Sequence, residues 1–303
     1  MPPIEPVTPP DSLVWRIIHF PLVLLVIAIA TMMGAGLLAR VASHAIPHAG
    51  NGWAAMLVAV LASACFVAGY FIFVRFIERR ARVDEFAPSG WARELGFGLA
   101  TGFALFSIVI GIIAIGGGYR IVGTHPAQVV LPVLALSITA GVTEEIILRG
   151  IFFRLVESWL GSWIALAASA ALFGALHLGN PNATLVAGAA IALEAGIMLA
   201  ALYMLTRRLW AAIGVHAAWN FTQGGVYGIA VSGFRQDGLF VPHVAGSDLL
   251  TGGSFGAEAS LPAIVVCTLA GAAILWKAYR KGNFVAPFWV RGAKPDQPAG
   301  LQA

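Results

Sequence analysis

The sequence predicts an all-α polytopic membrane protein of about eight transmembrane helices, with a polar site in the membrane interior. Hydrophobic residues make up 59% of the 303-residue chain and charged residues only 11%, too few to solvate a globular surface. The hydrophobic residues also gather in blocks of about 20, the length at which a helix crosses the ~30 Å apolar core of a bilayer. A few ionisable side chains lie inside these blocks, and we examine them below as a candidate site.

Eight apolar blocks are expected to form the transmembrane helices. They cover residues 17–38, 53–76, 95–115, 129–159, 163–178, 183–205, 210–230 and 262–279. The first block is longer than the core of a signal peptide, roughly 7–15 residues, so we expect a helix there. Residues 1–12 are expected to form a disordered tail, residues 13–281 the helical domain, and residues 282–303 a cytoplasmic tail.

The basic residues predict how the helices are oriented. Cytoplasmic loops of membrane proteins are rich in Lys and Arg, and here the loops after the second, fourth and sixth blocks and the C-terminal tail hold most of them. We therefore expect an integral protein of a bacterial plasma membrane with both termini in the cytoplasm. The formal charge of +4 follows from this pattern, so we expect no nucleic-acid partner. Cys65 and Cys267 lie in separate blocks and are expected to be packing residues.

Polar groups gather between residues 139 and 220, in three neighbouring apolar blocks. They are Glu144, Glu145, Arg149, His177, His216 and Asn220. An ionisable group at membrane depth costs roughly 2.5–3.5 kcal/mol on insertion scales, so such groups are rare and usually functional. We interpret these six residues as one site.

The spacing of these residues assigns them to helix faces. Glu145 and Arg149 are four residues apart and stack on one face, with the glutamate N-terminal, which is the favourable order. Glu144 is rotated from Glu145 by about 100° and points elsewhere. His216 and Asn220 share a face in the same way. We therefore expect Glu145 to pair with Arg149 and fix the helix, which leaves Glu144 free.

The predicted turn between the fourth and fifth blocks places Glu144 and His177 at one height. Glu144 precedes Leu160 by 16 residues, and His177 follows Gly161 by 16. Each is then about 24 Å from the turn, so the two face each other in an antiparallel hairpin. The rise along the seventh block from Arg208 brings His216 to the cytoplasmic half of the membrane as well.

Two mechanisms of peptide-bond hydrolysis are compatible with these groups. In one, Glu144, His177 and His216 hold Zn²⁺, with water as the fourth ligand. In the other, Glu144 and His177 hold the water directly, while His216 and Asn220 stabilise the oxyanion. The H-E-x-x-H zinc signature is absent from the chain, which favours the second mechanism.

The motifs resemble the CAAX protease and bacteriocin-processing family, which includes the type II CAAX prenyl endopeptidases. The resemblance covers about residues 129–225 and rests on Glu144-Glu145-x-x-x-Arg149, Phe173-x-x-x-His177 and His216-x-x-x-Asn220, in that order. It implies an intramembrane endopeptidase, a metalloprotease by the family's name, that cleaves a peptide or a prenylated protein at the bilayer. It also implies catalytic roles for Glu144, His177, His216 and Asn220, with Glu145 and Arg149 in support.

Two further residues are candidates for the cavity. Phe173 is expected to pack below His177, and Glu194, which has no ionic partner in its own helix, either lines the substrate cavity or bonds a neighbouring helix. Two other functions stay open. A transporter also uses intramembrane carboxylates and histidines, but the chain shows no internal repeat. A catalytically inactive scaffold would not need the intact set of polar residues.

Overall fold

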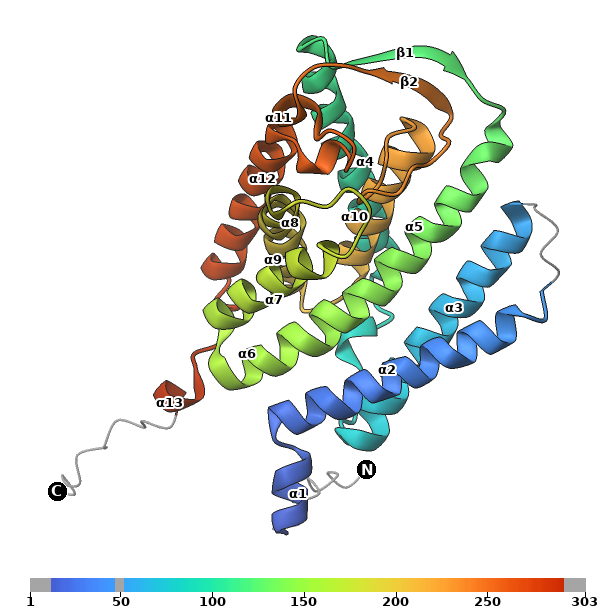
Figure 1. Ribbon diagram of the computed structural model, residues 1–303. Coiled ribbons are helices and arrows are strands. Elements are labelled where there is room, and N and C mark those ends of the chain that lie inside the picture. The colour runs from blue at the N-terminus through green and yellow to red at the C-terminus, as the bar shows by residue number, and fades with distance from the viewer. Residues whose placement is uncertain (1–11, 47–51, 292–303) are drawn as a thin grey trace.

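The computed structural model describes residues 12–46 and 52–291, and it has helical segments at all eight predicted positions (Figure 1). These segments are α2 (Pro21–Ser43), α3 with η1 (Gly52–Ile72 and Phe73–Ile77), α4 (Trp91–Ile115), α5 with η4 and α6 (Val130–Glu145, Ile146–Phe153 and Arg154–Leu160), α7 (Ser162–His177), α8 with η5 and α9 (Leu185–Ile191, Ala192–Gly196 and Ile197–Thr206), α10 with η6 (Trp210–Asn220 and Phe221–Val226), and α12 (Leu261–Arg280). The predicted all-α membrane fold is confirmed.

Six helices in the described part of the chain are long and apolar enough to cross a membrane. They are Pro21–Ser43, Gly52–Ile77, Trp91–Ile115, Ala127–Leu160, Leu185–Thr206 and Leu261–Arg280. Helix α7 is apolar but shorter, and α10 has only 11 residues before its geometry changes. Eight membrane crossings therefore stay a prediction, as does the side of the membrane on which each terminus lies.

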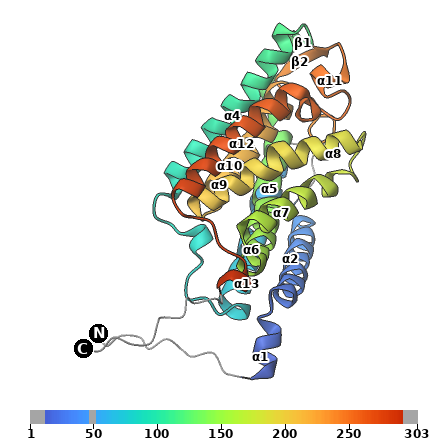
Figure 2. The same ribbon diagram turned by 90° about the vertical axis from the view of Figure 1, so that its left-hand side faces the viewer.

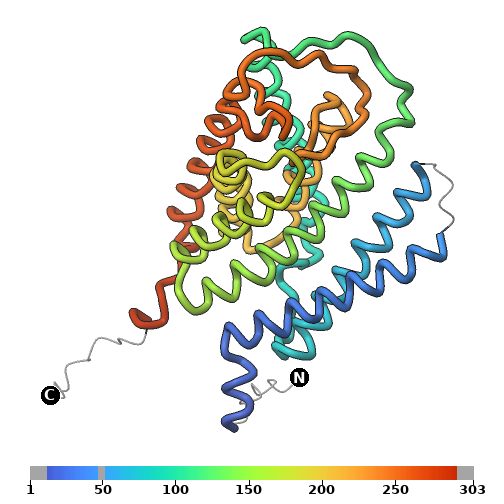
Figure 3. Tube along the Cα trace, viewed as in Figure 1, coloured from blue at the N-terminus to red at the C-terminus, as the bar shows by residue number. Residues whose placement is uncertain are grey.

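Helices α2 and α3 form an outer layer beside α5 (Figures 1 and 3). Their outward faces expose large apolar side chains such as Val26 and Met33, which are 67% and 71% exposed. Their inner faces reach the core, where the Tyr70 hydroxyl donates to the Gly150 carbonyl at 3.1 Å. An apolar exterior of this kind is stable in lipid rather than in water, which agrees with the composition of the chain.

Helices α4 and α10 pack with their backbones in contact, because glycines lie at their crossing. A Cβ added to Gly98 would lie 2.4 Å from the Ala211 carbonyl oxygen, and one added to Gly102 would lie 2.4 Å from the Val215 carbonyl oxygen. Gly214 faces α4 in return, with Leu95 O 2.7 Å from its ideal Cβ. Small residues permit such close approach between membrane helices. They fix the position of α10, which contains His216 and Asn220.

Four helices contain a stretch of π-helix, and three of these stretches adjoin predicted site residues. Segment η4 begins directly after Glu145, η5 contains Glu194, and η6 begins directly after Asn220. A π-turn holds one more residue than an α-turn, so it rotates the side chains on either side of it relative to each other. The site thus lies where the helices depart from regular geometry.

The Gly-rich stretch 231–260, between the seventh and eighth predicted helices, is structured. Strand β2 (Phe240–Val244) pairs antiparallel with β1 (Tyr119–Thr124) at one end of the helices (Figure 1). The short helices α11 (Asp248–Thr251) and η7 (Ala257–Ala259) follow, and η3 (Ala127–Val129) leads into α5. Burial raises the pKa of the Tyr119 hydroxyl to about 12.

Both ends of the described chain lie at the opposite end of the molecule from this hairpin (Figures 1 and 2). Helix α1 (Leu13–Ile18) is capped by Ser12, whose hydroxyl accepts from the Trp15 N–H, so residue 12 belongs to the helix rather than to the predicted tail. Helix α13 (Phe288–Arg291) lies within the predicted C-terminal tail. The rest of both predicted tails, residues 1–11 and 292–303, lies outside the described residues.

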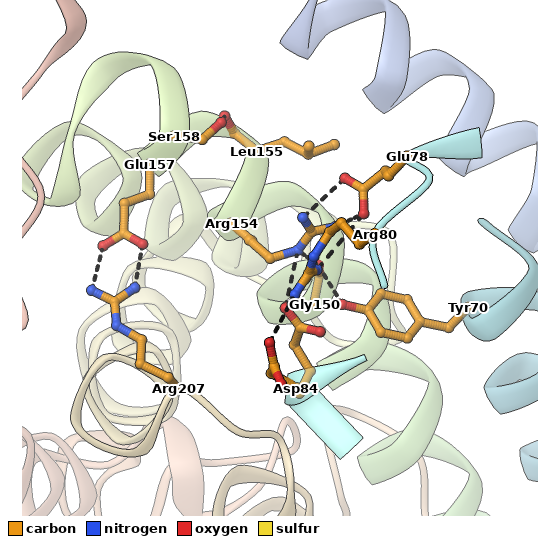
Figure 4. Close-up of polar contacts among 11 residues, drawn as sticks. Tyr70, Glu78, Arg80, Asp84, Gly150, Arg154, Leu155, Glu157, Ser158 and Arg207 are labelled. Atoms are coloured by element: carbon orange, nitrogen blue, oxygen red, sulfur yellow. Dashed lines mark hydrogen bonds and ion pairs between the residues drawn. The ribbon is translucent and has the colours of Figure 1, made fainter. Parts of the chain in front are cut away.

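A cluster of ion pairs joins η1, the connection after it and α6 at the same end (Figure 4). Arg154 forms a bidentate pair with Glu78, with both N–O distances at 2.9 Å. Arg80 pairs with Glu85 at 2.9 Å, and Arg207 pairs with Glu157 nearby. The 3₁₀ turn η2 (Asp84–Phe86) presents Glu85 to both Arg80 and Arg154. These ion pairs link the connection that follows η1 to α6.

Candidate active site

A cavity of about 530 Å³ lies between α5, α7, η5, α9 and α10 and is closed by the segment after α10. It is lined by all four residues predicted to be catalytic, Glu144, His177, His216 and Asn220. Phe173 and Glu194, the two further cavity candidates, line it as well. Residues spread over 77 positions of the chain from Glu144 to Asn220 thus border one space.

Glu144 lies in the last turn of α5 and keeps its carboxylate accessible from the cavity. Its side chain is 37% exposed, and its Oε2 atom lies 3.8 Å from Nε2 of His216. That separation is longer than a direct hydrogen bond. A carboxylate and an imidazole nitrogen facing each other at this distance can both act on a small molecule bound beside them.

His216 is buried in α10 and is oriented by Glu145. Its Nδ1 atom lies 2.9 Å from Glu145 Oε1. Because an ionised carboxylate can only accept, Nδ1 carries the proton and donates it, which leaves Nε2 for the cavity. The ring of Phe173 packs edge-on against the imidazole at 6.0 Å between centroids. A hydrogen bond and a ring contact therefore hold this imidazole in one orientation.

The predicted pair of Glu145 and Arg149 is present, and it does more than fix the helix. Arg149 Nη1 donates to Glu145 Oε1 at 2.8 Å, and both side chains are fully buried. Arg149 Nη2 donates to the carbonyls of Ala195 and Gly196 in η5, at 3.2 and 3.1 Å. The expectation that Glu145 serves only Arg149 is incomplete, because the same oxygen also binds His216.

His177 ends α7, and its Nδ1 atom lies 2.7 Å from the carbonyl oxygen of Phe173. Donation from Nδ1 to this carbonyl leaves Nε2 available to the cavity, as in His216. The turn at Gly161 lies where the sequence predicts it, and it allows α7 to run back along α6 and η4. The rings of Phe173 and His177 are in edge contact at 4.7 Å, as expected.

The arrangement does not form a metal site. No group of three or more His, Cys, Asp or Glu side chains in residues 12–46 and 52–291 is placed to hold a metal ion. The donor chemistry of Glu144, His177 and His216 suits Zn²⁺, but a zinc site needs three protein ligands converging on one point. The chemistry considered below therefore uses the side chains of the protein alone.

Asn220 is the last residue of α10 and lies one turn beyond His216 on the cavity wall. Its amide group can both donate and accept hydrogen bonds. The change to π-helix after Asn220 ends the regular α-helical face on which the two residues were predicted to stack. His216 and Asn220 precede this change, and both border the cavity, as their spacing of four residues predicts.

Three polar residues in the stretch 231–260, which the sequence analysis missed, also line the cavity, namely Ser232, Gln236 and Glu258. Glu258 lies in η7, is 2% exposed, and accepts a hydrogen bond from the Ser232 N–H. Burial raises the pKa of its carboxyl group to about 7. These residues lie in a Gly-rich stretch without helical periodicity, so the sequence contains no signal that brings them to the site.

The comparison with known families agrees with this geometry. Residues 126–222 match the family model described as type II CAAX prenyl endopeptidase Rce1-like. This segment therefore resembles an Rce1-like domain. It runs from the residue before η3 into η6 and contains Glu144, His177, His216 and Asn220. No curated protein and no solved structure matches the chain.

Proposed function

We propose that this protein is an intramembrane endopeptidase that hydrolyses a peptide bond of a membrane-associated peptide or a prenylated protein. The observation that carries the proposal is the pair formed by Glu144 Oε2 and His216 Nε2, 3.8 Å apart on the wall of a cavity inside an Rce1-like domain. A carboxylate that faces the cavity can accept a proton from water, and the resulting hydroxide can attack a carbonyl carbon.

The proposed chemistry uses the four cavity residues in two roles. Glu144, with His177 across the cavity, binds the water and takes its proton as the oxygen attacks the carbonyl carbon. His216 in its protonated form donates from Nε2, and Asn220 donates from its amide, to the oxygen that gains negative charge. Glu144 then delivers the proton to the amine that leaves when the C–N bond breaks. Each proton and bond is accounted for by residues of this chain.

The rim of the cavity supports a substrate that reaches it from the bilayer. Among the lining residues, Leu136 on α5, Leu176 on α7 and Phe234 are 58%, 59% and 50% exposed. The continuous helix formed by α5, η4 and α6 diverges from α7 at the turn that joins α6 to α7 (Figures 1 and 3). Large exposed apolar groups beside an opening suit a lipid chain attached to the substrate. A transporter would instead need polar groups along a path, whereas these gather in one cavity.

The proposal is tested with purified protein in lipid nanodiscs and quenched fluorescent peptides that end in a farnesylated cysteine and three further residues. We expect cleavage by the wild type and a loss of most turnover in Glu144→Gln. The same peptide without the farnesyl group should be cleaved more slowly, mainly through a higher KM. Cleavage that persists in Glu144→Gln, or no cleavage of any such peptide by the wild type, would contradict the proposal. Activity after chelation and re-addition of zinc tests separately whether a metal takes part.

A further inference from the structure

A second pair of carboxylates lines the cavity, apart from the residues assigned to catalysis. Glu194 projects from the π-helical segment η5, and Glu258 projects from η7 at the start of α12. They are 1% and 2% exposed, so both are almost completely removed from solvent. Two acidic groups from distant parts of the chain thus share the space into which Glu144 and His216 open.

Glu258 is held in place, whereas Glu194 has an oxygen without a partner. The Ser232 N–H donates to Glu258 Oε1 and fixes that carboxylate. Glu194 Oε2 is buried and has no hydrogen-bond partner within residues 12–46 and 52–291. Buried polar atoms are nearly always hydrogen-bonded, so this oxygen is available to a donor that the protein itself does not supply.

Neither carboxylate is paired with Lys or Arg in the described part of the chain. The Arg149 guanidinium, which reaches η5 from η4, donates to the Ala195 and Gly196 carbonyls and pairs with Glu145 instead. Burial of an uncompensated charge costs several kcal/mol, so such groups either hold a proton or bind a cation. Burial raises the pKa of Glu258 to about 7, so at neutral pH its carboxyl group can lose its proton to solvent when a cationic ligand binds there.

We propose that Glu194 and Glu258 form a subsite that binds a cationic side chain of the substrate, the ammonium of a lysine or the guanidinium of an arginine. The peptide nature of this ligand rests on the proposed function. The methylene stem would lie along the apolar part of the wall, which includes Ile191, Met198 and Val231. The charged end would meet the free oxygen of Glu194 and the fixed carboxylate of Glu258.

A divalent cation fits this pair less well. Ca²⁺ and Mg²⁺ need six or more oxygen ligands in total, and the described residues contain no acidic group of three at this place. An ammonium or guanidinium needs only two or three acceptors, which two carboxylates supply.

Binding is measured in the catalytically inert Glu144→Gln background, so that it is read independently of cleavage. Fluorescent farnesylated peptides are prepared in pairs that differ only by lysine or norleucine at one position near the cysteine, and a third set has arginine. Fluorescence anisotropy in nanodiscs gives the affinity of each. At one or more positions we expect lysine or arginine to bind about tenfold or more tightly than norleucine, because a close charge pair away from water couples strongly.

Two substitutions and a control locate the effect. Adding Glu194→Gln or Glu258→Gln should abolish the preference for the cationic side chain while the norleucine peptide keeps its affinity. Both replacements keep the shape of the side chain and its ability to accept a hydrogen bond. Glu85→Gln removes a buried carboxylate that pairs with Arg80 outside the cavity, so it should leave the preference intact.

The outcomes separate this inference from the proposed function. The subsite is overturned if lysine and norleucine peptides bind with equal affinity at every position, or if neither binds. It is also overturned if the preference survives in both the Glu194→Gln and the Glu258→Gln variants. Cleavage of the norleucine peptide by the wild type tests the endopeptidase alone. Cleavage without charge preference rejects the subsite only, and charge preference without cleavage rejects the endopeptidase only.

Discussion

Two groups of glutamates, at different places in the helical bundle, differ in how their charges are paired. In the ion-pair cluster of Figure 4, each main carboxylate has a guanidinium close by, with Arg154 and Glu78 at 2.9 Å and Arg80 and Glu85 at 2.9 Å. In the cavity, Glu144 lies 3.8 Å from the His216 imidazole, and Glu194 forms no ion pair with Lys or Arg in the described residues. Both groups are built from glutamates on or beside apolar helices, so composition alone does not separate them.

The difference teaches that pairing with a guanidinium distinguishes the carboxylates that stabilise the fold from those available for chemistry. Each charge of a buried ion pair is compensated by its partner, and removing one partner lowers the stability of the protein. An unpaired carboxylate in a cavity keeps its ability to bind a proton or a ligand. Glu145 belongs to both groups, because one oxygen pairs with Arg149 while also orienting His216. The following predictions test this distinction.

The largest expected effect is on turnover in Glu144→Gln. The substitution removes the proposed base, a carboxylate without a close ion-pair partner. The kcat should therefore fall by roughly 10²–10⁴-fold while the melting temperature changes little. Rate assays with a farnesylated peptide and thermal unfolding in detergent measure the two quantities. A variant that unfolds more easily but keeps its kcat would place Glu144 with the structural ion pairs.

Glu145→Gln should reduce both stability and activity. It leaves the fully buried Arg149 without its counter-charge, which costs about 3–5 kcal/mol, and it weakens the hydrogen bond that orients His216. The double variant Glu145→Gln, Arg149→Met removes both charges and should recover part of the stability without recovering activity. Full activity in the double variant would show that Glu145 does not act through His216.

The raised pKa of Glu258 predicts a pH-dependent stability difference between the wild type and Glu258→Gln. A carboxyl group whose pKa is raised to about 7 in the folded state stabilises the protein when protonated, and this contribution is lost as pH rises from about 4.5 to above 7. The difference is about 3 kcal/mol at most, from about 1.36 kcal/mol for each unit of pKa. Relative to the wild type, Glu258→Gln should therefore gain stability across this range. A constant difference in melting temperature from pH 4.5 to 8 would contradict this.

The smallest effect is expected from Glu78→Gln in the ion-pair cluster. Arg154 is 15% exposed and keeps contact with Glu85, so the loss should be about 1–2 kcal/mol, between the values for exposed and fully buried pairs. The kcat of the folded protein should be unchanged. Comparison of kcat per folded molecule, after correction for the unfolded fraction, measures this. A loss of kcat similar to that of Glu144→Gln would remove the distinction between the two groups.

The sequence predicts most of the helices and the core of the site, because polar residues are conspicuous in apolar blocks. Glu144, His177, His216 and Asn220 are singled out in this way and all line the cavity, and the turn at Gly161 fixes the pairing of α6 with α7. The bond between Glu145 and His216 joins residues 71 positions apart, so no helical spacing reveals it. Glu258 lies where the chain has no periodicity. The π-helical segments depend on tertiary packing, which local sequence patterns do not encode.

The backbone contact between α4 and α10 also determines which parts of the site can be mobile. Gly98, Gly102 and Gly214 let the two helices touch without intervening side chains, so α10 cannot shift without opening a void along its length. His216 and Asn220 are thereby anchored to a rigid wall. In the proposed mechanism, the donors to the oxyanion are thus held in place before the reaction, so their reorganisation adds little to the barrier.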